Sequence, residues 1–152
     1  MSKQVSFYHL SKTNLEEALP KLLEKVLEID GKAIVLCNDA GKVKLVDGLL
    51  WSVGGKRFIP HATANDNDIE HNPIFVTSTE ENPINANFLV NLKFDDSDFY
   101  SKFQRTLLVF SGSSDSELNH ARGLWKKLKG DSSFELKYYQ QNDKGAWEEK
   151  KD

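Results

Sequence analysis

The chain has 152 residues, of which 39% are hydrophobic and 28% are charged, and its formal net charge is −3 at pH 7. This length fits one domain that buries a single core without disulfides or a structural metal, so residues 1–152 are predicted to form one domain with a frayed tail over 143–152. No apolar run approaches the roughly 20 residues of a membrane-spanning helix. The N-terminal segment shows no export signal and Cys37 is the only cysteine, so the sequence predicts a cytoplasmic protein without disulfides.

The first part of the chain alternates strands with helices. Residues 4–10 alternate polar and apolar side chains, which predicts a strand. Apolar residues at helical spacing follow Thr13, whose distance from Glu16 is that of a capping box, and they predict a helix that stops at Gly31. The continuous apolar run 32–37 is typical of a strand that is covered on both faces.

A second helix and a loop are predicted next. Asp39 is a suitable N-cap, and the apolar residues after it are spaced for a helix that ends at a pair of glycines. Residues 56–72 begin with a short apolar tip, Phe58, Ile59 and Pro60, and continue with small and polar residues without periodicity. Such a composition predicts a surface loop.

The rest of the chain predicts four strands and one helix. The strands are expected over 73–78, 87–92, 106–112 and 134–141, and the last of them alternates like an edge strand. Ser114 and Glu117 have the spacing of a capping box and open a helix over 115–129. This alternation of elements predicts a single-domain, three-layer α/β/α sandwich around a mostly parallel, mixed sheet with an antiparallel edge.

Motifs for catalysis or for a cofactor are missing from the sequence. No G-x-G-x-x-G follows the first strand, and the glycine pair before Lys56 lacks the Ser or Thr of a P-loop. The four histidines do not have metal-ligand spacing, and the serines of 111–116 have no assignable histidine base. The sequence therefore predicts no catalytic residue, no metal and no other cofactor.

The helix over 115–129 is unusually basic for an acidic chain. Arg122, Lys126 and Lys129 are spaced i, i+4 and i+7, so they lie along one stripe beside Trp125. An arginine can hold a carboxylate through two hydrogen bonds and a tryptophan offers an apolar contact, so this stripe suits a short acidic peptide with an apolar end. A structural explanation stands beside it: lysines in the last turn compensate the helix dipole, and Trp125 can belong to the core.

Two further functions stay open at this point. The same helix could bind single-stranded nucleic acid directly, which the net negative charge disfavours. An enzyme could also assemble its site from loops at the carboxyl ends of the strands.

Several stretches together resemble one known family. They are FYHL, ALPKLLEKVLEIDGKAIVLC, LLWSVGGKRFIPH, the strand ending FLVNL, and ARGLWKKLK with the strand that follows it. In their order and spacing they resemble the chi subunit of the bacterial DNA polymerase III holoenzyme, an accessory protein of the clamp loader, over nearly the whole chain. The resemblance implies a Rossmann-like fold without a nucleotide site and a non-catalytic replication adaptor.

The resemblance also implies a first partner and its site. The family binds the acidic C-terminal tail of single-stranded-DNA-binding protein, which ends in proline and phenylalanine. The family's tail-binding arginine, aromatic residue and lysine fall on Arg122, Trp125 and Lys126. Family members also carry a basic residue one turn earlier on this helix, where this chain has ELNH, so binding is expected to be weaker or less sensitive to salt.

A second partner is implied on the clamp-loader side. The family contacts psi, the small subunit that joins chi to the clamp loader, through a surface that falls on Trp51, Phe58, Ile59 and Pro60. The expected partners are thus the tail of single-stranded-DNA-binding protein and psi or another clamp-loader component, with a helicase as a further candidate. No membrane and no strong direct binding of DNA are expected.

Overall fold

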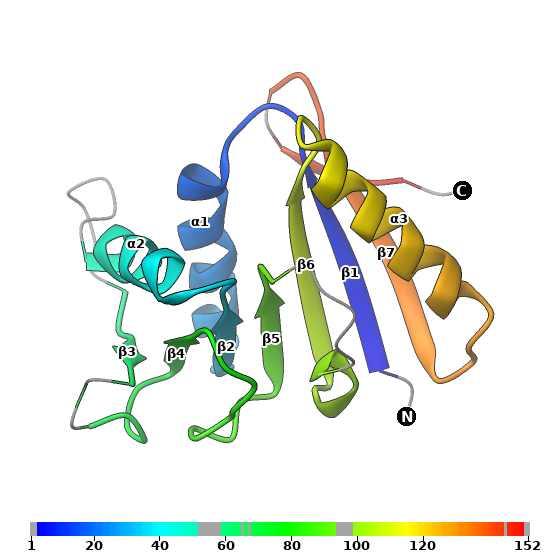
Figure 1. Ribbon diagram of the computed structural model, residues 1–152. Helices are drawn as coiled ribbons and strands as arrows, with labels where there is room; N and C mark the ends of the chain where they lie inside the picture. The colour runs from blue at the N-terminus through cyan, green and yellow to red at the C-terminus, as the bar shows by residue number, and fades with distance from the viewer. Residues whose placement is uncertain are drawn as a thin grey trace.

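The computed structural model describes residues 3–51, 59–64, 66, 68–93, 99–144 and 146–150. The strands in this part of the chain are β1 (Lys3–Leu10), β2 (Ala33–Leu36), β3 (Ala62–Thr63), β4 (Ile74–Thr77), β5 (Phe88–Asn91), β6 (Arg105–Ser111), β7 (Phe134–Gln141) and β8 (Trp147–Glu149). The helices are α1 (Leu15–Glu28), α2 (Ala40–Trp51), α3 (Asp115–Lys129) and a short 3-10 helix, η2 (Phe99–Lys102). Figure 1 shows their arrangement.

The strands form one mixed sheet in the order β3-β4-β2-β5-β6-β1-β7-β8. All pairs from β3 to β7 in this order are parallel, and β8 alone is antiparallel to its neighbour. Successive strand residues face opposite cores: Val35 packs with α1 and α2, whereas Ile34 and Leu36 belong to the core that contains the buried residues of α3. The predicted three-layer sandwich with an antiparallel edge is confirmed. Of the helices described, none is long and apolar enough to cross a membrane.

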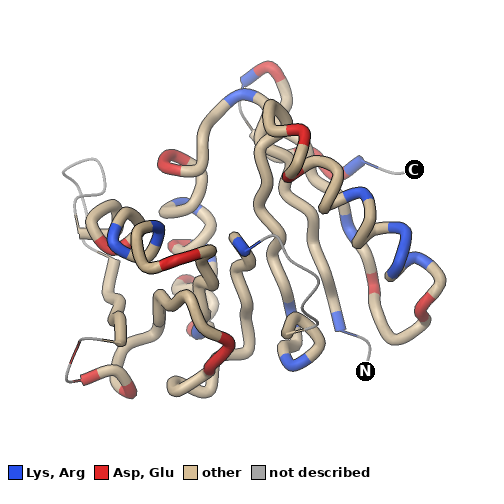
Figure 2. The backbone as a smooth tube through the Cα atoms, viewed as in Figure 1, with Lys and Arg blue, Asp and Glu red and all other residues tan. Residues whose placement is uncertain are grey.

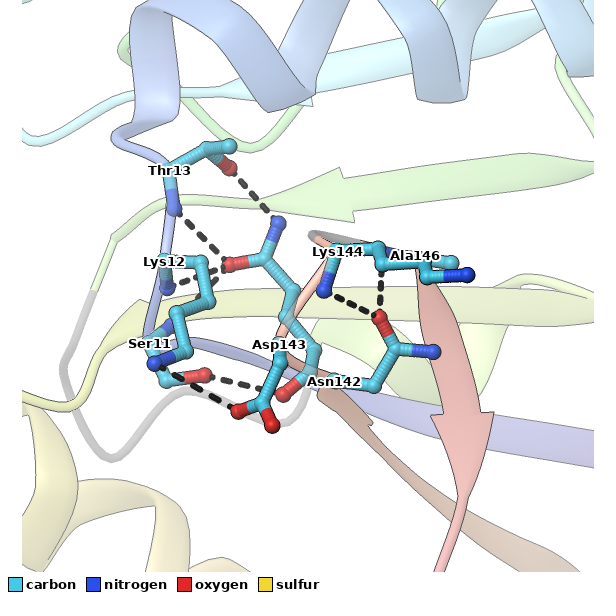
Figure 3. A network of polar contacts seen from close by, with 8 residues as sticks. Ser11, Lys12, Thr13, Asn142, Asp143, Lys144 and Ala146 are labelled. Carbon is cyan, nitrogen blue, oxygen red and sulfur yellow. Dashed lines mark hydrogen bonds and ion pairs between the residues drawn. The ribbon is translucent and has the colours of Figure 1, made fainter.

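The start of α1 differs from the predicted capping box. Asn14 is the N-cap, and its side chain accepts a hydrogen bond of 3.0 Å from the backbone N–H of Glu17. The Thr13 hydroxyl instead accepts a 2.7 Å hydrogen bond from Nε2 of Gln141, at the far end of the chain (Figure 3). The predicted box of Thr13 with Glu16 is therefore wrong, because a tertiary contact uses Thr13 and the neighbouring asparagine caps equally well.

The N-cap residues predicted for the other two helices are confirmed, but the capping box at Ser114 forms only its first half. The side chain of Asp39 accepts a 2.8 Å hydrogen bond from the N–H of Lys42 at the start of α2. At the start of α3, Ser114 accepts one of 3.4 Å from the N–H of Glu117. The Glu117 carboxylate accepts from the N–H of Ser111 at 3.0 Å and so ties α3 to the end of β6.

The C-terminal segment departs from the prediction. A frayed tail was expected, yet Trp147–Glu149 form β8, and the Trp147 ring packs edge-on against Tyr8 with a centroid distance of 5.1 Å. β7 is therefore an inner strand, between β1 and β8, and not the predicted edge. Because β8 pairs only with residues 139–141, most of the outer side of β7 has no partner strand among the described residues, and this explains its edge-like alternation.

The predicted loop 56–72 is described only from residue 59 onward. Two of its residues form the short edge strand β3. The predicted end of the second helix at the glycine pair lies outside the described residues. What the structure adds here is the position of Ile59, which is buried in the core beneath α1 and α2.

Candidate functional site

A groove of about 350 Å³ opens beside α3, and we call it the α3 groove. Its lining residues come from β6, α3, β7 and the residue that follows β8, and they are Phe110, Leu118, Ala121, Arg122, Trp125, Lys126, Tyr138 and Lys150. The three residues predicted from the sequence as a peptide site, Arg122, Trp125 and Lys126, all line this one groove.

The amphipathic pattern of α3 places these side chains. Ala121 and Leu128 are buried and fix one face of the helix on the sheet. Arg122 and Lys126 are one turn apart, so they lie on the same side of the helix, and both are exposed. The cations therefore border the apolar interior of the groove.

Trp125 provides the apolar centre of the groove. Its ring meets Phe7 edge-on at a centroid distance of 5.2 Å and Tyr138 at 5.9 Å. The side chain is half-buried, and it both packs on the core beneath α3 and lines the groove. The structural and the functional interpretation of Trp125 are thus compatible.

A polar pair lies behind the apolar wall. Nδ1 of His9 is 2.6 Å from the hydroxyl oxygen of Tyr138, and the His9 ring packs over Gly112, where a Cβ would come within 2.1 Å of Nε2. Burial lowers the pKa of His9, and Arg122 lowers it further. Burial raises the pKa of Tyr138, so at neutral pH its hydroxyl keeps its proton and pairs with the neutral imidazole.

The groove is strongly positive. Arg122, Lys126 and Lys150 line it, and no lining residue among those described is acidic. Ion pairs involving the three cations are absent from the described part of the chain. The arrangement can hold a carboxylate by charge-assisted hydrogen bonds next to an apolar side chain.

Sequence reasoning missed the residues that the strands contribute. Tyr138 lies in the alternating run of β7, where periodicity predicted a strand but could not place it under α3. Lys150 follows β8, in the segment expected to be frayed. No local signal connects either residue with α3, because the sheet order alone brings them there.

The predicted clamp-loader-side residues are not all on one surface. Trp51, at the end of α2, is 63% exposed and Pro60 is exposed, but Ile59 is only 1% exposed. Phe58 lies outside the described residues. The Ile59 side chain folds back into the core, so Trp51 and Pro60 are the exposed members of this set among the described residues.

His61 connects this surface to α2. Its Nε2 is 2.6 Å from Oδ1 of Asp47, its Nδ1 is 2.7 Å from the carbonyl oxygen of Ile59, and its ring lies 5.8 Å from that of Trp51. Both ring nitrogens thus face oxygen atoms of neighbouring segments. These contacts hold residues 59–61 against the end of α2.

A polar cleft of about 550 Å³ lies at the carboxyl ends of β1 and β6, where doubly wound sheets often bind ligands. Its side chains serve the local structure: Asn14 caps α1, and the hydroxyls of Ser111 and Ser113 are 2.8 Å apart. Within the described cleft, no hydrogen bond joins either serine to His9. Nor do the described residues include a group of three or more His, Cys, Asp or Glu that could hold a metal ion.

Comparison with known proteins places the chain among replication proteins. A family model described as "DNA polymerase III chi subunit, HolC" matches residues 1–135. A protein of Rickettsia prowazekii (strain Madrid E), "Probable DNA polymerase III subunit chi", is 33% identical over 88 residues, which cover 58% of this chain and 53% of the relative. The match thus spans about half the length of that relative. The family match includes Arg122, Trp125 and Lys126 and stops before Tyr138 and Lys150.

Proposed function

The chain belongs to the DNA polymerase III chi subunit family, and from this we propose that it is a non-catalytic replication adaptor that binds the acidic C-terminal tail of single-stranded-DNA-binding protein. The observation that carries the proposal is the α3 groove, in which Arg122, Trp125 and Lys126 line a single cavity. A chi protein with this groove would link single-stranded-DNA-binding protein to the clamp loader. Direct binding of nucleic acid by α3 is the alternative that the experiment below must exclude.

The chemistry of the groove suits the end of such a tail. The terminal carboxylate would accept hydrogen bonds from the Arg122 guanidinium, with Lys126 adding a second positive charge one turn along α3. The terminal aromatic ring would pack on Trp125 and the apolar residues beside it, which leaves little of that ring in water. A small site of this kind is expected to bind with a Kd on the order of micromolar, or about −8 kcal/mol, and several tails on one partner would raise the effective strength.

We further propose that a clamp-loader component binds this protein at the end of α2. Trp51 and Leu45 on this helix are 63% and 51% exposed, which is unusual for large apolar side chains. Since α2 packs on one face of the sheet and α3 on the other, the two partners would occupy separate surfaces. Psi or another clamp-loader component is the expected partner there, through Trp51 and Pro60.

The direct test is a fluorescence-anisotropy titration of a labelled acidic peptide that ends in Pro-Phe. Wild type should bind it saturably and less tightly at high salt, and Arg122→Ala should lose more than about tenfold in affinity, or roughly 1.4 kcal/mol. Lys21→Ala, on the exposed side of α1, is the matched control and should bind like wild type. Equal binding by Arg122→Ala would contradict the proposed site, and tight binding of a labelled oligonucleotide instead of the peptide would favour the nucleic-acid alternative.

A further inference from the structure

A second hollow adjoins the α3 groove. It measures about 280 Å³ and shares three lining residues with the groove, namely Trp125, Tyr138 and Lys150. Its other lining residues are Lys129, Phe134, Leu136, Lys137 and Glu149. The second hollow therefore extends from the groove toward the C-terminal end of α3 and the beginning of β7.

Lys150 lies where the two cavities meet. Its backbone N–H donates a 2.7 Å hydrogen bond to the carbonyl of Tyr138, and the preceding Glu149 is in register with Tyr139. Residues opposite one another in an antiparallel pair point to the same face of the sheet. Lys150 therefore shares the α3 side of the sheet with Tyr138, whereas Glu149, opposite Tyr139, lies at the edge of the second hollow and lines it together with three lysines.

Charge is distributed unevenly along α3. Asp115 and Glu117 occupy its first turn, whereas Lys126, Lys127 and Lys129 occupy its last. Figure 2 shows this change from acidic to basic along the helix. An acidic peptide is repelled at the beginning of α3 and attracted at its end.

The backbone of β7 also favours an extended peptide in the second hollow. β8 pairs with residues 139–141, so the outer side of β7 from Phe134 to Lys137 has no strand partner in the described part of the chain. An open sheet edge can hydrogen-bond an extended segment of another chain.

We propose that the acidic residues before the tail's final Pro-Phe leave the α3 groove past Lys150 and follow the second hollow toward the C-terminal end of α3. The inference rests on the proposed function. Lys150 then supplies a positive charge beside the peptide at the point where the two cavities meet. Lys150 follows β8 and lies beyond residues 1–135, the part of the chain that the family model matches.

The test compares two peptides on four proteins by anisotropy. One peptide is the acidic tail, and the other keeps Pro-Phe but has Asn and Gln in place of Asp and Glu. Lys150→Gln should weaken the acidic peptide about two- to fivefold and leave the neutral peptide unchanged, as expected for a partly exposed charge pair. Lys127 is on the same helix but lines neither cavity, so Lys127→Gln should change the affinity for either peptide much less than this. Arg122→Ala should lower the affinity for both peptides.

The outcomes separate the two claims. If Arg122→Ala behaves as expected but Lys150→Gln binds both peptides like wild type, or weakens both equally, the path past Lys150 is overturned and the proposed function stands. If wild type does not bind the acidic peptide, both are overturned.

A spin label at the N-terminus of the peptide gives an independent measure of its direction. Broadening of amide signals near Lys129 and Phe134 is expected, whereas broadening near Ser114 and Leu118 would overturn the inference.

Discussion

Gln141 connects the end of β7 to the segment between β1 and α1, and its replacement by leucine should destabilise the fold. Its side-chain oxygen accepts hydrogen bonds from the backbone N–H groups of Ser11, Lys12 and Thr13 at 3.1, 2.8 and 3.0 Å, and its Nε2 donates to the Thr13 hydroxyl (Figure 3). Gln141 is only 6% exposed. Gln141→Leu keeps a similar volume but leaves three backbone donors without this acceptor.

The expected loss follows from these contacts. Each intramolecular hydrogen bond contributes about 0.5–1.5 kcal/mol net, and a buried donor left without an acceptor costs more. One oxygen with two lone pairs accepts all three N–H groups, so these three contacts are counted as about two full hydrogen bonds. The bond from Nε2 to the Thr13 hydroxyl brings the total to about three hydrogen bonds. The free energy of unfolding should therefore fall by about 2–4 kcal/mol, which corresponds to a decrease in Tm of roughly 5–15 °C for a chain of this size.

Urea unfolding followed by tryptophan fluorescence measures this loss. Gln141→Glu keeps the accepting oxygen and should lose less than Gln141→Leu. Gln140→Leu changes the neighbouring residue, whose side chain forms no hydrogen bond within the described residues, and should unfold close to wild type. The reasoning is refuted if Gln141→Leu lies within about 0.5 kcal/mol of wild type or if the glutamate variant loses more than the leucine variant.

Three further predictions concern His9, Cys37 and Trp125. Burial and Arg122 lower the pKa of His9 below its ordinary value of 6.5. Just below pH 6.5 the unfolded chain therefore binds more protons than the folded chain. The stability due to neutral His9 is complete above about pH 6.5 and is lost as the pH falls toward the folded-state pKa. The stability difference between wild type and His9→Asn should accordingly shrink on acidification, and a pH-independent difference would contradict this. Burial raises the pKa of Cys37 to about 12, so Ellman's reagent should label the thiol rapidly only in denaturant, and fast labelling of the native protein would be inconsistent with the core position. Trp125→Ala removes the edge-on contacts with Phe7 and Tyr138 and should lower the free energy of unfolding by about 2–3 kcal/mol, somewhat less than for a fully buried tryptophan. The same variant should also lose peptide binding. A thermal melt like that of wild type would argue against the packing role.

The parts of the fold that local patterns determine were predictable. The continuous apolar run of β2 predicted a strand buried on both faces, and the caps at Asp39 and Ser114 are where the sequence placed them. Arg122, Trp125 and Lys126 could be grouped in advance because residues spaced by three and four on one helix necessarily lie close together.

The parts that long-range contacts determine were not predictable. Thr13 lost its capping role to a hydrogen bond with Gln141, which is 128 positions away. Lys150 reaches the α3 groove because β7 pairs with β1 and β8 pairs with β7, and no periodicity in a three-residue strand indicates such an order. Likewise, the burial of Ile59 depends on how its segment folds onto α2, where its N–H donates to the carbonyl of Leu50, and no periodicity in the predicted loop indicates that contact.

The central claim is that the α3 groove binds the acidic tail, and chemical-shift mapping of the isotope-labelled protein with the Pro-Phe peptide tests it most directly. The account predicts that the largest amide shifts fall on Phe110, on residues 121–126 and on Tyr138, and saturate together. Shifts centred on Trp51 and His61 or on the cleft around residues 11–14, or no shifts at all, would contradict it.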